Sequence, residues 1–115
     1  MQFQVLTLVR LRAPEISPPD TPEDDQIQAA HMVYLAGLAK EGKILVNGPI
    51  KRLDDPKFLG LSVYTVGVDE ARALAMQDPA YKAGWIEPHV DTWLVPYGPK
   101  TIGDRVDLDT ERAGS

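Results

Sequence analysis

Apolar side chains recur along the chain in patterns that predict two kinds of element. Alternation or short apolar runs predict β-strands at residues 2–11, 43–48, 58–66 and 89–97. Helical spacing predicts α-helices at residues 21–41 and 70–77, and a further helical turn at residues 80–85. The resulting order, β-α-β-β-α-β, predicts an α+β chain with the ferredoxin-like fold, in which both helices cover one face of an antiparallel sheet.

The helix at residues 21–41 has clear start and stop signals. Thr21 is a suitable N-cap, Pro22 fits the first helical position, and Gly42 is a natural end. The apolar stripe of this helix consists of Ile27, Ala30, Tyr34, Leu35 and Leu38. His31 lies within the stripe, so we expect an imidazole on the inward face, where it needs a polar partner.

The second helix supplies a candidate partner for that histidine. We expect Asp69 to cap the helix and Asp78-Pro79 to end it. Both helices cover the same sheet face in the predicted fold, which allows Asp78 to reach His31. A carboxylate in contact with imidazole fixes the tautomer of the ring, as a general base requires. The alternative is a core histidine and an ordinary turn aspartate.

The predicted sheet has apolar residues on both faces of two strands, 2–11 and 58–66. An antiparallel sheet with one solvated face shows polar residues there, so this second face needs a cover. A second copy, packed sheet against sheet, predicts a homodimer with a closed or nearly closed α/β barrel, and a higher assembly of dimers is allowed. Residues 1–98 are predicted to form one domain. Residues 99–115 are predicted to be a tail that is flexible or contacts the dimer partner.

Composition narrows the function classes. The chain has 115 residues, a formal net charge of −5 and no cysteine. No basic run stands out, so neither nucleic acid nor a membrane is an expected partner. Thiolate chemistry is excluded, and there is no phosphate-binding glycine motif, so we expect no cofactor. The N-terminus resembles a strand more than a signal peptide, which makes the cytoplasm the expected location.

Several other residues are candidates for binding a small organic molecule. Gly48 and Pro49 form a turn where backbone can approach a ligand closely. Tyr34 shares the helix stripe, although such aromatic residues more often belong to a core. His89 and Trp93 share one face of the last strand with Asp91, and they line either a site between the sheets or a solvated barrel rim. Metal-ligand spacing is absent, so we expect no metal site.

Two long segments of the chain resemble the YCII-related family. They are HMVYLAGLAKEGKILVNGPI and LGLSVYTVGVDEARALAMQDPAYKAGWIEPHVDTWLVP. That family is similar to muconolactone isomerases and other dimeric α/β-barrel proteins. The resemblance covers roughly residues 1–97. It implies a ferredoxin-like subunit, a dimer, and a His-Asp pair as the active site, which corresponds here to His31 and Asp78.

These observations lead to a functional hypothesis and an alternative. The hypothesis is a cofactor-independent enzyme in which His31 and Asp78 perform general acid/base chemistry on a small organic molecule, as an isomerase or lyase does. The alternative is a dimeric domain that binds a small molecule without turnover or has a structural role only. A cavity beside His31 favours the enzyme or the binding domain, whereas a filled core favours the structural role.

Overall fold

The computed structural model describes residues 4–51 and 54–96. Within those residues the chain forms four strands and three helices, in the order predicted from the sequence. They are β1 (Gln4–Arg12), α1 (Asp24–Lys40), β2 (Ile44–Pro49), β3 (Phe58–Tyr64), α2 (Val68–Ala75), α3 (Pro79–Lys82) and β4 (Glu87–Val95). The ferredoxin-like α+β fold is confirmed. The tail predicted at residues 99–115 lies outside the described residues.

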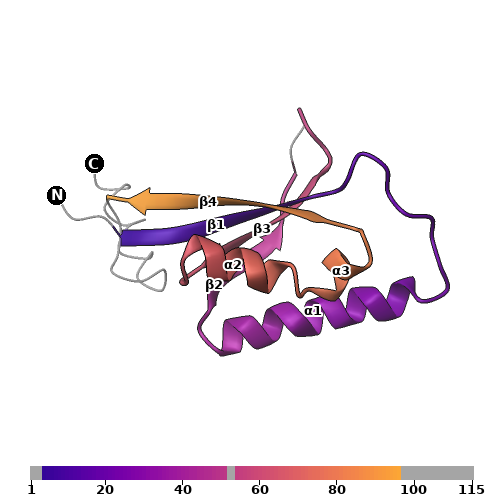
Figure 1. Cartoon of the computed structure of the whole chain (residues 1–115), viewed down its shortest axis with the longest axis horizontal. Coiled ribbons are helices and arrows are strands. Elements are labelled where there is room, and N and C mark those ends of the chain that lie inside the picture. The colour runs from indigo at the N-terminus through magenta and orange to yellow at the C-terminus, as the bar shows by residue number, and fades with distance from the viewer. Residues whose placement is uncertain (1–3, 52–53, 97–115) are drawn as a thin grey trace, which may run out of the picture.

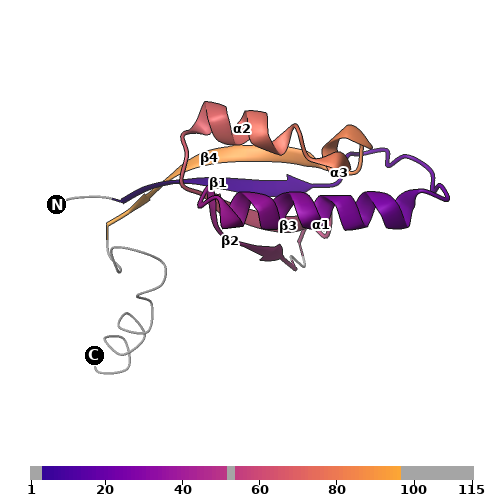
Figure 2. The same cartoon turned by 90° about the horizontal axis from the view of Figure 1, so that it is seen from below.

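The strands form one sheet with the order β2-β3-β1-β4, and every neighbouring pair is antiparallel. β2 and β3 are consecutive strands with antiparallel pairing, the arrangement that a short connection allows. Figure 1 shows all three helices on one side of the sheet. In Figure 2, α1 lies along the β2–β3 side and α2 lies over β4.

The core lies between the sheet and the helices. Val9 in the central strand β1 is fully buried, and its neighbour across the ladder is Ser62 of β3. The other buried apolar residues of this cluster are Leu11, Leu35, Leu38, Ile44, Tyr64, Ala71, Ala75, Ala80 and Ile86. Burial of such side chains contributes about 25 cal/mol per Å² of apolar surface, so this layer provides the main stabilisation of the subunit.

The start of α1 differs from the prediction. The N-cap residue is Glu23, and neither Thr21 nor Pro22 belongs to the helix. The Asp24 carboxylate instead accepts hydrogen bonds from the backbone N–H and the hydroxyl of Thr21, at 3.1 and 2.9 Å. The side chain of the N-cap residue Glu23 makes no capping hydrogen bond. The end is as predicted, with Gly42 in the left-handed conformation at a φ of 80°.

Two further expectations about the helices were wrong. Gly67 is the N-cap of α2, and Asp69 lies in the first turn, where its charge favours the positive helix end without a capping bond. Ala30 of α1 is exposed, because the inward stripe runs through His31, Tyr34 and Leu35. The face of α1 that packs inward is therefore narrower than the stripe of apolar residues predicted from the sequence.

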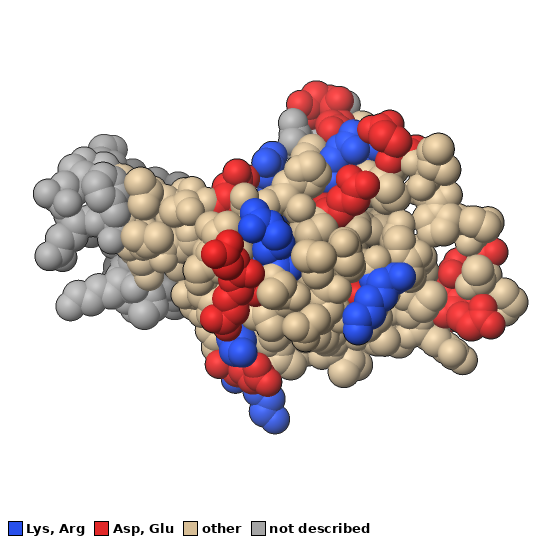
Figure 3. Space-filling view, in the orientation of Figure 1, with Lys and Arg blue, Asp and Glu red and all other residues tan. Residues whose placement is uncertain are grey.

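The sheet face opposite the helices carries both apolar and charged side chains. Val46 and Trp93 are large apolar residues of this face with 42% and 43% of their surface exposed. Arg10 and Asp91 form an ion pair of 3.1 Å on the same face. On the side of the molecule seen in Figure 3, acidic and basic residues are interspersed. None of the helices in the described part of the chain is long and apolar enough to cross a membrane.

Candidate active site

His31 and Asp78 are in direct contact. Nδ1 of His31 lies 2.7 Å from Oδ2 and 2.9 Å from Oδ1 of Asp78. The side chains are 15% and 3% exposed, respectively, so the contact is largely shielded from water. The inward position of His31 on α1, which the apolar stripe indicated, brings the ring to the start of α3. Whether the pair performs chemistry stays a prediction.

Local helix capping holds the Asp78 carboxylate in place. Asp78 is the N-cap of α3, and its Oδ1 accepts a hydrogen bond of 2.9 Å from the backbone N–H of Ala80. Pro79 follows at the first helical position, where the lack of an N–H has no consequence. The Asp-Pro pair therefore begins a short helix as well as ending the previous one. The carboxylate that contacts His31 is fixed by backbone at the same time.

This geometry selects the protonation pattern of the imidazole. An ionised carboxylate only accepts hydrogen bonds, so Nδ1 of His31 carries the proton that points to Asp78. Nε2 of a neutral ring then keeps its lone pair, and no group among the described residues bonds it. Within residues 4–51 and 54–96, no group of three His, Cys, Asp or Glu side chains could hold a metal ion. The arrangement suits proton transfer at Nε2.

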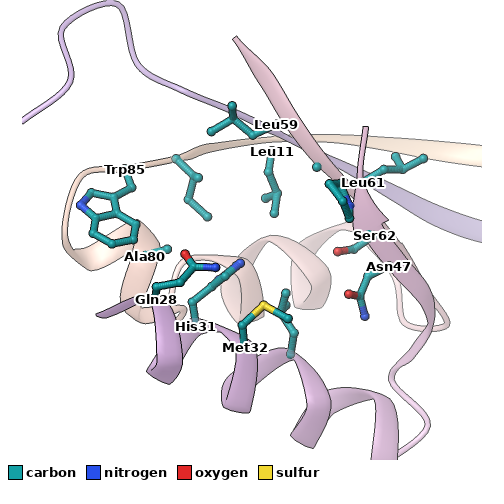
Figure 4. Close-up of a pocket in the computed structure, with 15 residues that line it drawn as sticks. Leu11, Gln28, His31, Met32, Asn47, Leu59, Leu61, Ser62, Ala80 and Trp85 are labelled. Atoms are coloured by element: carbon teal, nitrogen blue, oxygen red, sulfur yellow. The ribbon is translucent and has the colours of Figure 1, made fainter. Parts of the chain in front are cut away.

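A cavity of about 360 Å³ lies beside His31. It is bounded by α1, by β2 and β3, and by the segment from α3 to β4, and Figure 4 shows the His31 ring pointing into it. The lining residues are Leu11, Gln28, His31, Met32, Leu35, Asn47, Gly48, Pro49, Leu59, Gly60, Leu61, Ser62, Ala80, Trp85 and Ile86. The free nitrogen thus faces a mostly apolar space large enough for a small molecule.

The structure brings only some of the predicted ligand-binding residues to this cavity. Gly48 and Pro49 line it together with His31, and Asp78 lies behind the ring. Tyr34 is not a lining residue, because its hydroxyl donates a hydrogen bond of 2.7 Å to the backbone carbonyl of Leu74. Burial and the negative charge of Asp78 raise the pKa of Tyr34. Its role is packing between α1 and α2.

His89 and Trp93 lie on the opposite face of the sheet. Their neighbours on β1 are Arg10 and Leu6, which point away from the helices. The ring of His89 packs against Phe58, with 5.7 Å between the ring centres. These two candidates are therefore separated from the cavity beside His31 by the sheet itself. A binding role between sheets stays a prediction for them.

Sequence reasoning missed several lining residues. Gln28 precedes His31 by three positions and Leu35 follows it by four, so helical spacing alone places both near the ring. Trp85 also lines the cavity, although its residue type is equally typical of a core or an interface. Asn47 gave no signal except its position before Gly48. Its contribution depends on the register of β2 against β3, where it is opposite Ser62.

Two solved structures resemble the chain over most of its length. One is 5-chloro-2-hydroxyhydroquinone dehydrochlorinase from Burkholderia phenoliruptrix in complex with 2,5-dihydroxybenzoquinone, with 25% identity, a TM-score of 0.55, and coverage of 76% of this chain and 92% of that chain. The other is muconolactone isomerase, with 20% identity, a TM-score of 0.59, and coverage of 84% of this chain and 94% of that chain. The second likeness shows a common fold. A comparison with curated proteins gives no match.

A family model gives the most specific comparison. The model of the YCII-related domain matches residues 9–90, a span that begins in β1 and ends in β4. The match includes His31, Asp78 and every residue that lines the cavity. The chain belongs to the YCII-related domain family.

Proposed function

We propose that this protein is a cofactor-independent enzyme that transfers protons on a small organic molecule, with His31 as the general acid/base and Asp78 as its positioning residue. One observation carries the proposal: Nδ1 of His31 is bonded to a backbone-held carboxylate while the ring points into a cavity. A general base needs an unprotonated nitrogen within reach of its substrate and a fixed orientation. A purely structural contact between helices does not require a cavity beside it.

The proposed reaction begins with removal of a proton from a carbon next to a carbonyl group. The Nε2 lone pair takes the proton, and the electrons of the C–H bond move to the carbonyl oxygen to give an enolate. In an isomerisation, the imidazolium returns the proton to a different carbon. In an elimination, the enolate expels a leaving group with its electron pair, and the imidazolium later loses its proton to water. The Asp78 carboxylate stabilises the imidazolium in both cases.

The comparisons support this reaction class. The dehydrochlorinase named above has 25% identity and shares 76% of the chain in the same fold. Loss of hydrogen chloride, which its name describes, is an elimination. The cavity beside His31 is of a size that accommodates a single substituted ring.

The active form proposed here is a homodimer in which the open faces of two sheets pack together. The support is the pair of apolar residues Val46 and Trp93, which are exposed on that face in a single subunit. Val46 is opposite Val63 on β3, and Val63 is opposite Leu8 on β1, so an apolar strip crosses three strands. Val63 is buried within the subunit, whereas Val46 and Trp93 are exposed. Leaving these two apolar side chains in water is unfavourable, and the same face of a second copy covers them.

Solvent deuterium exchange tests the proposed chemistry without knowledge of the natural substrate. Small cyclic ketones and hydroxylated rings are incubated with the protein in D₂O, and loss of the C–H signals is followed by NMR. We expect catalysed exchange with at least one compound, and a fall of about 10²–10⁴-fold in the His31→Asn variant. The exposed Gln77→Ala variant is the control and retains the rate. A deuterium exchange rate in the His31→Asn variant that equals the wild-type rate contradicts the proposal.

A further inference from the structure

The polar groups of the cavity are divided between its two ends. Figure 4 shows His31 and Gln28 entering from α1 on one side, and Asn47 and Ser62 standing on the strands at the other. The rest of the lining is mostly apolar and includes Leu11, Met32, Leu35 and Trp85. A ligand that fills this space meets hydrogen-bonding groups at both of its ends and apolar surface along its middle.

Asn47 is well suited to hold the far end of such a ligand. Its side chain amide offers both a donor and an acceptor, and it forms no hydrogen bond with any other side chain or backbone group in residues 4–51 and 54–96. It follows the bulge in β2 and precedes Gly48, which also lines the cavity. Asn47 is exposed in the free subunit, so a ligand reaches it without a change in the fold.

The volume and the charge of the cavity restrict the ligand further. An apolar cavity of about 150 Å³ is enough to hold benzene, so about 360 Å³ holds one ring with substituents. None of the described residues that line it is Lys, Arg, Asp or Glu. A charged substituent therefore loses its hydration without gaining a counter-charge from these residues. The lining favours an uncharged ligand.

We propose that the site takes an uncharged single-ring compound with hydroxyl or carbonyl groups at opposite positions, one beside His31 and the other hydrogen-bonded to Asn47. This inference rests on the proposed function for the role of His31, and it assigns Asn47 as a specificity-determining residue. A compound with one polar group fills the apolar middle but leaves the Asn47 amide without a ligand partner.

The test is an NMR titration with matched ring compounds, with the indole N–H of Trp85 as the reporter inside the cavity. Benzene-1,4-diol is compared with phenol and with 4-hydroxybenzoate. We expect the diol to bind about fivefold tighter than phenol, because it forms one more hydrogen bond. The Asn47→Ala variant should lose this preference while its affinity for phenol is unchanged. The Gln77→Ala variant, which removes an exposed amide elsewhere, should behave as the wild type.

The outcomes separate this inference from the proposed function. Equal affinities for the diol and phenol, a preference that survives in Asn47→Ala, or tighter binding of 4-hydroxybenzoate each overturn the inference. None of those results decides the proposed function, which is tested separately by deuterium exchange in the wild type and the His31→Asn variant. Conversely, an Asn47-dependent preference together with unchanged exchange in His31→Asn supports the ligand site and contradicts the enzyme. Failure of all three compounds to shift the Trp85 signal overturns the inference.

Discussion

The Asp78 carboxylate joins two elements by accepting from the imidazole of His31 and from the backbone N–H of Ala80 at once. The two side chains are 47 residues apart in the sequence and come together because α1 packs against α3. Helix capping therefore fixes the orientation of the carboxylate, and the carboxylate fixes the orientation of the imidazole. Stability and proposed function depend on the same side chain.

Removal of the Asp78 carboxylate should destabilise the subunit. Asp78→Ala leaves the α3 N-terminus without its cap and Nδ1 of His31 without its partner, which together cost about 2–4 kcal/mol. Asp78→Asn keeps an acceptor oxygen and should cost less. The free energy of unfolding in urea measures both. Asp69→Ala is the control, because that exposed side chain makes no capping bond, and it should change stability by less than about 0.5 kcal/mol. If Asp78→Ala and Asp69→Ala lower the free energy of unfolding equally, Asp78 does not have this stabilising role.

Gly60→Ala should narrow the cavity without disturbing the fold. The added Cβ lies 3.4 Å from the carbonyl oxygen of Gly48 and 3.8 Å from Cδ1 of Leu11, so it fits with little adjustment and takes room beside two lining residues. We expect the affinity for benzene-1,4-diol in the NMR titration to fall by about tenfold, because an added methyl group overpacks the cavity when the ligand is bound. Gly67→Ala, whose Cβ meets nothing within 4 Å, should bind as the wild type. Unchanged affinity in Gly60→Ala places the ligand elsewhere.

Stability should decline at alkaline pH, in part through Tyr34. Burial and the nearby Asp78 charge raise the pKa of Tyr34, and burial raises that of Tyr64. The folded state therefore keeps these protons when the unfolded state loses them, so the free energy of unfolding falls as pH rises above about 10. Tyr34→Phe removes one of these groups and its hydrogen bond to Leu74. It should cost about 1 kcal/mol at neutral pH.

Urea unfolding of the wild type and Tyr34→Phe between about pH 8 and pH 11 tests this effect. The variant should lose less stability across that range than the wild type, because one titrating group is gone. Equal losses would show that the protonation of Tyr34 is not linked to folding.

The proposed dimer should be sensitive to charge on the open sheet face. Val46→Asp places a carboxylate in the apolar strip, where it is buried without a partner in the dimer. We expect the wild type to have twice the 12.7 kDa chain mass in sedimentation analysis and the variant to be monomeric at micromolar concentration. Val33→Asp, on the exposed side of α1, should remain dimeric. A wild type of 12.7 kDa contradicts the dimer.

Local sequence signals predicted the fold well because they act over short distances. Strand alternation and the Gly42 stop gave the correct elements and order. The helix starts were missed because the residue type alone does not decide where a helix begins. The N-cap of α1 is Glu23, while the Thr21 hydroxyl bonds the Asp24 carboxylate, and the N-cap of α2 is Gly67 in place of Asp69. Such alternatives differ by about 1 kcal/mol, which tertiary packing easily overrides.

Only part of the candidate site could be predicted from the sequence. His31 stood out because a polar residue in an apolar stripe needs an explanation, and the family resemblance supplied Asp78. Trp85 and Asn47 could not be predicted as site residues. Trp85 lines the cavity through the position of the α3–β4 segment relative to α1, and Asn47 does so through the register of β2 against β3. Tyr34 does not line the cavity, and helical spacing could not show this because it does not distinguish a residue that faces the sheet from one that faces a neighbouring helix.

The protonation state of the two nitrogens of His31 tests the central claim most directly. The chain has two histidines, so a His89→Gln variant assigns the signals in ¹⁵N–¹H NMR. With the ring neutral, we predict the proton on Nδ1 and the chemical shift of an unprotonated nitrogen for Nε2, and we predict that Asp78→Ala abolishes this preference. A proton on Nε2 in the wild type, or a tautomer that is the same in Asp78→Ala, would contradict the account.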